Sequence, residues 1–135
     1  MFRGKRVSGN KEWIFGNANY YPNLNRWFIR LHPTMNVLQT LEDEIVANTI
    51  GQYTGLIDKN GKRIFEGDIV DVEYDIQYIG VAAERIGLFT VVFNDGCFMK
   101  EKPSGGLFHF IPSDKCKVIG NIHDNPELLE KENKK

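Results

Sequence analysis

The chain has 135 residues, of which 41% are hydrophobic and 26% charged, and its formal net charge is −1. This length fits one domain that buries a core without disulfides or metals, and the composition excludes a largely disordered protein. The net charge near zero excludes a uniformly positive surface that holds nucleic acid through its phosphates alone.

The N-terminal residues MFRGKRVSGN carry basic side chains without an apolar stretch after them, so we expect no secretory signal. Apolar runs in the chain are shorter than the ~20 residues that a membrane-spanning helix needs. Cys97 and Cys116 stand far apart without CxxC spacing, and we expect them to be reduced thiols. The sequence therefore predicts a cytoplasmic protein that does not enter a membrane.

Two strands are predicted in the N-terminal third. Apolar and polar side chains alternate over residues 11–21, residues 22–25 (PNLN) are typical of a turn, and residues 26–32 alternate again. We expect these segments to form a hairpin or meander.

The segment 34–48 is ambiguous. Val37, Leu38, Leu41 and Ile45 have helical spacing, whereas the residues that follow favour strands, so we expect extended chain from about Ile45 onward. Glu42, Asp43 and Glu44 form an acidic group within it.

The stretch GLIDKNGKRIF predicts a hairpin. Ile57 and Ile64 flank a polar tip in which Asn60 and Gly61 can adopt positive φ. In the following FEGD, Gly67 permits a tight turn, and the Asp68 carboxylate can accept hydrogen bonds from nearby backbone N–H groups. Residues 68–74 then predict a strand.

The C-terminal half predicts further strands and one short helix. Residues 76–87 are expected to form a long hairpin excursion, and residues 88–99 a hairpin with a type I′ turn at Asp95 and Gly96, where Phe93 and Phe98 face each other. Further strands are expected at 107–111 and 115–122. Asn125 is expected to cap a helix that has Pro126 in its first position. Together the segments predict a mainly β protein, a small barrel or sandwich.

Residues for catalysis, metal binding or cofactor binding do not assemble in the sequence. His32, His109 and His123 lack ligand spacing, and we expect His109 at the surface. The DKNG run fails the spacing of a calcium loop. We expect Glu66 and Asp68 to bind backbone donors rather than to act as paired catalytic carboxylates. The sequence therefore predicts no catalytic residue, no metal and no cofactor.

Aromatic residues are in surplus near the N-terminus, where basic residues are also common. Most of them should enter the core, and the remainder could form a subunit interface or, beside the basic residues, a platform for single-stranded nucleic acid. The candidate interaction surface consists of Arg3, Lys5, Arg6, Trp13, Tyr20, Tyr21 and Trp27.

Several motifs occur in an order that resembles YopX-like proteins, a family of bacteriophages and prophages of Gram-positive bacteria. They are FRGKR (2–6), EWIFG (12–16), TIGQYTGLIDKNGKRIFEGDIV (49–70), VVFNDGCF (91–98) and VIGNIHDNPELL (118–129). The resemblance implies an SH3-like β-barrel or roll, a phage origin and a location in the host cell cytoplasm. It implies no reaction, cofactor or catalytic residue.

We therefore expect a single YopX-like domain over residues 1–135. It comprises an N-terminal β segment (1–50), a barrel-like core (51–123) and a short helix with a tail (124–135). The leading functional hypothesis is a non-catalytic phage accessory protein that forms a homo-oligomer or binds a phage or host protein. The alternatives are a nucleic-acid-binding module that uses the basic N-terminal strand and nearby aromatic residues and, ranked last, a small hydrolase around Glu66, Asp68 and a histidine.

Overall fold

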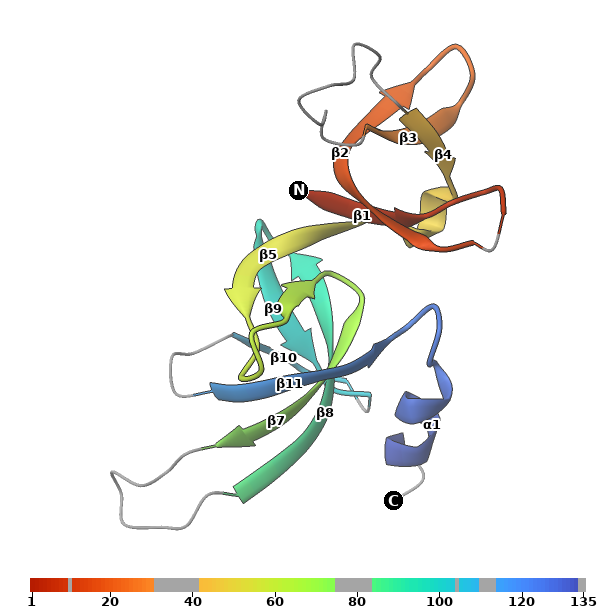
Figure 1. Cartoon of the computed structure of the whole chain (residues 1–135). Helices are drawn as coiled ribbons and strands as arrows, with labels where there is room; N and C mark the ends of the chain where they lie inside the picture. Colours follow the sequence, from red (N-terminus) through yellow and green to blue (C-terminus); the bar gives the residue numbers. More distant parts are fainter. Residues whose placement is uncertain (10, 31–41, 75–83, 104, 110–113, 134–135) are drawn as a thin grey trace. The chain divides into compact units, whose positions relative to one another are not determined.

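The structure is a computed structural model that describes residues 1–9, 11–30, 42–74, 84–103, 105–109 and 114–133 (Figure 1). Strands dominate it, arranged in two antiparallel sheets with one short α-helix, so the predicted mainly β class is confirmed. The strands are β1 (Phe2–Lys5), β2 (Trp13–Tyr21), β3 (Arg26–Arg30), β4 (Glu42–Ile45), β5 (Gly51–Ile57), β6 (Arg63–Phe65), β7 (Asp68–Tyr74), β8 (Glu84–Asn94), β9 (Cys97–Glu101), β10 (Leu107–His109) and β11 (Asp114–Asn121).

The chain divides into two compact units, Met1–Tyr53 and Thr54–Lys135, and β5 runs from one into the other. The segment boundary expected at residue 50 lies close to this division. That the two units make up one domain stays a prediction.

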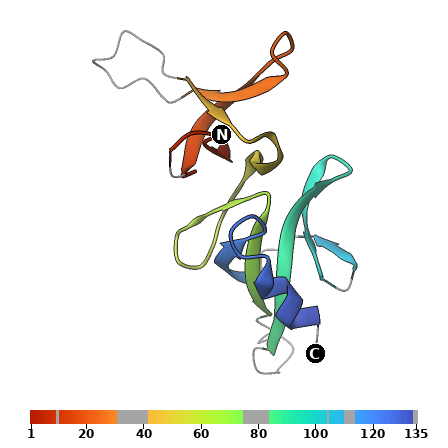
Figure 2. The same ribbon diagram turned by 90° about the vertical axis from the view of Figure 1, so that its right-hand side faces the viewer.

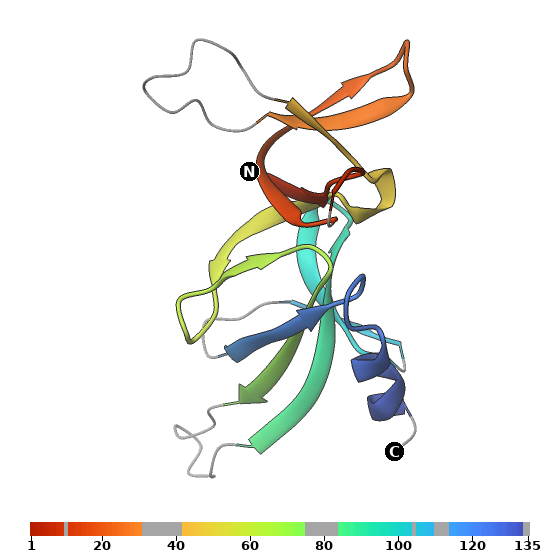
Figure 3. The same cartoon turned by 45° about the vertical axis from the view of Figure 1, so that its right-hand side comes forward.

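In the first unit the strands are ordered β4-β3-β2-β1-β5, and each neighbouring pair is antiparallel. The chain just after β1 also meets β4, through a bridge between Arg6 and Ile45 and a 2.8 Å hydrogen bond from the Val46 N–H to the Lys5 carbonyl. The sheet therefore curls back on itself, as Figure 3 shows. Gly4 allows this close approach, since a Cβ there would lie 2.8 Å from Ile45 Cδ1.

The segment before β5 differs from the expectation of extended chain from Ile45 onward. Its strand lies earlier, at β4, and a 3-10 helix (η1) follows at Ala47–Thr49. The Thr49 hydroxyl donates to the Val46 carbonyl at 2.6 Å and accepts the Lys5 N–H at 2.9 Å, so a local turn prevails over the β propensity of threonine. Val37, Leu38, Leu41 and His32 lie outside the described residues.

The sheet of the second unit is ordered β10-β9-β8-β7-β11. Its core consists of Ile64, Val70, Val72, Phe89, Val91, Cys116 and Val118, contributed by β6, β7, β8 and β11. Alternating residues of β7 and β8 supply four of these side chains, which places them on one face of the sheet. Ile69 and Leu88, on the other face, are buried as well. The helix α1 (Glu127–Asn133) lies near β8. Among the described strands, neither sheet closes into a barrel along its length.

The remaining predicted strands of this unit occur with shifted ends. The expected excursion at 76–87 is already strand from Glu84 onward, and its first residues lie outside the described chain. The strand expected at 107–111 is β10, whose last two expected residues are likewise outside it. Asn125 precedes the helix, but its Oδ1 accepts the Asn121 N–H at 3.2 Å rather than capping α1.

Candidate interaction surface

The DKNG turn between β5 and β6 is organised by a buried carboxylate. Asp58 is 7% exposed; its Oδ1 accepts the N–H groups of Asn60 (2.9 Å) and Lys62 (2.8 Å), and its Oδ2 accepts the Val118 N–H at 2.9 Å. Gly61 has φ +83°. Asn60 does not share the positive φ expected for it, because the bond from its own N–H to Asp58 forms a local Asx turn. The turn ties the hairpin to β11.

Asp58 is held in its charged form by these donors. Burial acts to raise its pKa, but the backbone hydrogen bonds from Val118, Lys62 and Asn60 outweigh burial and leave the pKa below the ordinary value. The carboxylate therefore supports the fold and is a poor proton donor at neutral pH.

Asp68 has a similar structural role. Its side chain is buried and its Oδ2 accepts the Phe65 N–H at 2.7 Å, as the sequence predicts. Gly67 has φ +92°, and its N–H donates to the Val91 carbonyl at 2.8 Å. The FEGD step thus fastens the entry of β7 to β8.

The hairpin of β8 and β9 has the predicted turn. Asp95 and Gly96 both have positive φ, +50° and +82°, as a type I′ turn requires. Phe93 and Phe98 are cross-strand partners whose ring centres lie 5.0 Å apart. The turn residues therefore shape the backbone, and the Cys97 Sγ beside them donates to the Asn94 carbonyl at 3.4 Å.

The predicted interaction surface separates into three groups in the first unit. In the first group, the guanidinium of Arg3 lies 4.6 Å from the centre of the Trp13 ring and the Lys5 ammonium lies 5.5 Å from it. Arg3 is 7% exposed. Arg3 and Lys5 therefore both make cation–π contacts with the Trp13 ring.

Arg6 forms the second group with two carboxylates. It pairs with Glu12 at 2.6 Å and with Asp43 at 3.1 Å. Hydrogen bonds to Glu12 and Asp43 raise its pKa above the ordinary value. Its charge is thus balanced within the first unit.

The third group lies on the hairpin of β2 and β3 and is built of aromatic pairs. Tyr20 packs on Trp27 (5.0 Å between ring centres), and Tyr21 packs on Phe28 (5.1 Å). Tyr20 and Tyr21 are consecutive in a strand, so the two pairs lie on opposite faces of the hairpin. Tyr20 is 42% exposed and Leu24, in the connecting turn, 56%. We call Tyr20, Tyr21, Leu24, Trp27 and Phe28 the aromatic hairpin.

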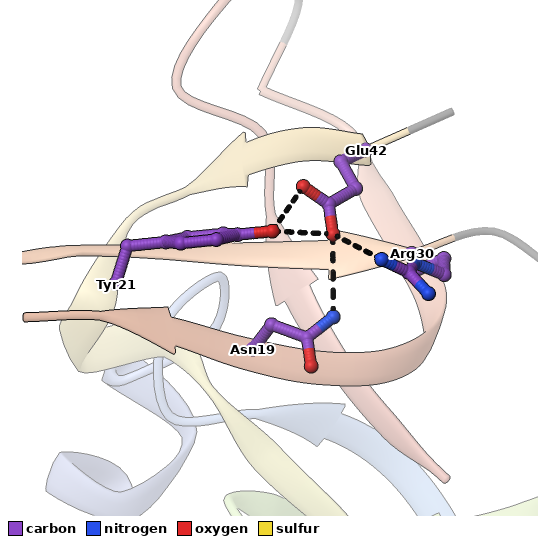
Figure 4. A network of polar contacts seen from close by, with 4 residues as sticks. All are labelled: Asn19, Tyr21, Arg30 and Glu42. Carbon is purple, nitrogen blue, oxygen red and sulfur yellow. Dashed lines mark hydrogen bonds and ion pairs between the residues drawn. The ribbon is translucent and has the colours of Figure 1, made fainter. Parts of the chain in front are cut away.

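One face of the aromatic hairpin is fixed by a network around Glu42 (Figure 4). The Tyr21 hydroxyl lies 2.8 Å from Glu42 Oε1 and 2.7 Å from Oε2, while Arg30 Nη2 and Asn19 Nδ2 lie 3.2 Å and 3.4 Å from Oε1. The hydrogen bond to Glu42, followed by burial, raises the Tyr21 pKa. Glu42, on β4, therefore positions side chains from two other strands, β2 and β3.

A model of the YopX protein family matches residues 1–130. The chain belongs to the YopX family. No curated protein matches this YopX-family chain. The family assignment predicted from the sequence motifs is thus confirmed.

Sequence reasoning on this YopX-family protein missed the Glu42 network. The signal was available, because Arg26 and Arg30 of RWFIR lie four positions apart and Glu42 and Glu44 of EDEI lie two positions apart, so the two members of each pair share one face of a strand. Antiparallel pairing places Arg30 opposite Glu42, and Arg26 pairs with Glu44 at 3.4 Å. Recognising residues 42–45 as a strand was the missing step.

Other candidate chemistry is limited in the described part of the YopX-family chain. There, no three His, Cys, Asp or Glu residues gather as metal ligands. Cys97 is half-buried and Cys116 buried, and neither forms a disulfide. Neither His32 nor the side chain of His109 is within the described structure. None of the described helices is long and apolar enough to span a membrane.

Proposed function

We propose that this protein is a non-catalytic phage accessory protein of the host cell cytoplasm that self-associates or binds a protein partner. The aromatic hairpin is the element that contacts the partner. YopX-family membership supports the phage origin, because that family resemblance implies phages and prophages of Gram-positive bacteria.

The observation that carries the proposal is the pair of exposed aromatic contacts on the aromatic hairpin. Tyrosine and tryptophan are enriched in protein interfaces because a rigid ring contributes a large apolar area together with a polar group. Here the two tyrosines are already held, Tyr21 by Glu42 and Tyr20 by a 2.6 Å bond from its hydroxyl to Asn25 Oδ1. A partner therefore meets a preorganised surface, which lowers the entropic cost of binding.

The charges of the first unit favour a protein over a nucleic acid. A protein binds nucleic acid through lysine and arginine side chains that neutralise phosphates and release the counterions condensed on them. Instead Arg6, Arg26 and Arg30 each pair with a carboxylate, and Arg3 is buried against Trp13. The basic N-terminal strand is thus the weaker candidate for a binding surface.

A hydrolase around Glu66 and Asp68 is weaker still. The Asp68 carboxylate is buried and accepts the Phe65 N–H. The carboxylate therefore holds the backbone at the start of β7. A general base instead has to reach a substrate or a water molecule.

The strand order of the second unit supports a further proposal, that this unit has an SH3-like fold. Strands β7, β8, β9 and β10 form a meander, and β11 returns to pair with β7. A meander of four strands with a fifth strand beside the first is the strand order of SH3-like folds. Such folds serve many binding roles, so the order supports the fold and leaves the partner open.

Site-specific photo-crosslinking in infected or lysogenic host cells tests the proposed function. A photoreactive phenylalanine analogue replaces Leu24 in the aromatic hairpin and, as the matched control, the exposed Lys59 in the turn after β5. We expect a discrete protein adduct from position 24 alone, identified by mass spectrometry. The same adducts from both positions, or none from position 24, contradict the proposal.

Fluorescence anisotropy with single- and double-stranded oligonucleotides at low salt tests the alternative. We expect no salt-dependent binding at tens of micromolar protein. Binding that weakens steeply with salt would favour the nucleic-acid module instead.

A further inference from the structure

The turn between β5 and β6 contains the one asparagine of the 135-residue chain that is followed by a glycine, Asn60 before Gly61. Both residues are exposed, and nothing lies within 4 Å of a Cβ built at Gly61. Figure 2 shows the loop between β5 and β6, drawn in yellow-green, at the margin of the second unit. Water and hydroxide therefore reach these two residues from the solvent.

An asparagine before a glycine is reactive because of the backbone nitrogen that follows it. Once hydroxide has removed its proton, this nitrogen can attack the asparagine Cγ, and glycine has no side chain to obstruct the approach. The N–Cγ bond forms and the Cγ–Nδ2 bond breaks, and the amide nitrogen takes a proton from water and leaves as ammonia. The cyclic imide then adds one water molecule and opens to aspartate, or to isoaspartate, in which the main chain passes through Cγ.

Hydrogen bonding and charge keep the nucleophile of this reaction, the Gly61 nitrogen, in its protonated form. The Gly61 N–H donates to the Asp58 carbonyl at 3.0 Å. A hydrogen bond made by the protonated form opposes the loss of the proton. The Asp58 carboxylate has the same effect, because its negative charge disfavours a second negative charge on a neighbouring amide. The folded turn therefore makes the Gly61 nitrogen a weaker nucleophile.

The same turn fixes the orientation of the Asn60–Gly61 peptide. Asp58 Oδ1 accepts the N–H groups on both sides of it, from Asn60 at 2.9 Å and from Lys62 at 2.8 Å. The Lys62 carbonyl in turn accepts the Asp58 N–H at 2.8 Å. Attack on Cγ requires this peptide to rotate about the Asn60 Cα–C bond, and the rotation breaks hydrogen bonds of the turn. The reaction therefore needs a local opening of the turn.

We propose that Asn60 is a deamidation site that Asp58 protects, so that Asn60 reacts only while the β5–β6 turn is open. The inference goes beyond the proposed function, since it concerns the second unit and does not depend on partner binding by the aromatic hairpin. A local opening frees the Gly61 N–H while the rest of the sheet stays folded. The rate of deamidation therefore reports the fraction of time for which the turn is open.

The product prevents the turn from closing in its original form. Isoaspartate adds a carbon atom to the main chain at position 60, so the N–H groups of residues 60 and 62 no longer both fit Asp58 Oδ1. Either product also brings a new carboxylate into the turn, and its charge repels that of Asp58. The hydrogen bond from the Val118 N–H to Asp58 Oδ2, 2.9 Å long, joins the turn to β11 and is weakened as a result. Deamidation therefore makes a transient opening permanent.

A peptide-mapping time course of the full chain at mildly alkaline pH tests the proposal. Mass spectrometry measures the loss of Asn60, and the other asparagines of the chain are internal controls. We expect Asn60 to react at least about tenfold more slowly in the folded wild type than in urea, because the turn is open for less than about a tenth of the time. Equal rates in the folded and unfolded chain overturn the protection, and an absence of product at Asn60 in urea overturns the site.

Two variants test whether Asp58 provides the protection. Asp58→Asn keeps the size of the side chain but removes its charge and one acceptor oxygen, and Asn60 should then react about tenfold faster than in the wild type. Asp68→Asn is the matched control, because Asp68 is also a buried carboxylate that accepts a backbone N–H but lies outside the turn. At an equal folded fraction, measured by urea unfolding, Asp68→Asn should react like the wild type. Equal acceleration in both variants assigns the reaction to global unfolding and overturns the proposal.

Hydrogen exchange of the Gly61 amide keeps the test decisive if Asp58→Asn does not fold. In the wild type, exchange and deamidation both require the open turn. The slowing of each process relative to the unfolded chain should therefore agree within about threefold. A Gly61 amide that exchanges as fast in the folded protein as in the unfolded chain contradicts the protection by Asp58.

Discussion

Two carboxylates, one in each unit, collect several hydrogen bonds and use them differently. Asp58, in the second unit, accepts three backbone N–H groups. Two come from its own turn, Asn60 and Lys62, and the third comes from Val118, 60 residues along the chain. Glu42, in the first unit, binds side chains of Tyr21, Arg30 and Asn19. The Asp58 carboxylate connects two backbone segments of the second unit, whereas the Glu42 carboxylate orients side chains at the surface of the first unit.

The difference separates the scaffold from the binding element. A backbone N–H has no alternative position when its acceptor is lost, so it remains buried and unsatisfied. A tyrosine or arginine side chain near the surface can turn toward water instead. We therefore expect changes at Asp58 to affect folding and changes at Glu42 to affect the shape of the aromatic hairpin.

The largest effect is expected from Asp58→Ala. Three N–H groups lose a charged acceptor, and the free energy of unfolding should fall by about 3 kcal/mol. Urea unfolding followed by circular dichroism measures the change. Asp95→Asn is the matched control, because Asp95 is exposed and asparagine tolerates its positive φ, and it should stay within about 0.5 kcal/mol of the wild type. Equal stability of Asp58→Ala and Asp95→Asn would refute the scaffold role.

Valine at the two turn glycines should have the next largest effect. Gly61→Val and Gly96→Val each place a β-branched side chain at positive φ, at a cost on the order of 1–2 kcal/mol. Nothing lies within 4 Å of a Cβ built at either position, so the cost arises from backbone strain alone. Thermal unfolding measures it, and unchanged melting temperatures in both variants would mean that these turns do not hold the hairpins.

The contribution of Asp58 should also depend on pH. Its pKa is lowered by folding, so its ionised form stabilises the protein above about pH 4, the ordinary pKa of aspartate, and this stabilisation declines as the pH falls through the folded-state pKa. The stability difference between wild type and Asp58→Asn should therefore narrow as the pH is lowered from 6 toward about 2. A difference that widens on acidification has the wrong sign for this mechanism.

Glu42→Gln is expected to change stability least, by less than about 1 kcal/mol, because its partners lie near the surface. It should lower the Tyr21 pKa toward the ordinary value, since the hydrogen bond to Glu42 is the main cause of the rise. Absorbance titration of tyrosinate, with Tyr21→Phe to identify the Tyr21 signal, measures this shift. An unaltered Tyr21 pKa would show that Glu42 does not hold the ring.

The sequence predicted the mainly β class and the local turns well because turn residues act locally. An Asp-Gly pair favours a type I′ turn in a two-residue hairpin, and Asp95 and Gly96 adopt one here; Asp68 accepts a bond from a residue three positions away. The same reasoning could not reveal that Asp58 also binds Val118. That contact depends on how β11 packs beside the turn, which is set by the whole sheet.

The sequence identified the types of residue in the interaction surface but not their arrangement in space. Seven residues were grouped by their chemistry, and the structure separates them because Arg3 and Lys5 lie against Trp13 while Arg6 pairs with Glu12 and Asp43. The ambiguous pattern at 34–48 hid the acidic strand that neutralises the arginines. Charge pairing between strands requires the register, and the register was unknown until both strands were recognised.

Carbon-13 NMR titration of the side-chain carboxyl groups tests most directly whether Asp58 belongs to the scaffold. We expect the Asp58 resonance to titrate below the ordinary aspartate value of about 3.9 and to lose this depression when the protein is unfolded in urea. A midpoint at or above that value in the folded protein would mean that the three backbone donors do not hold the carboxylate.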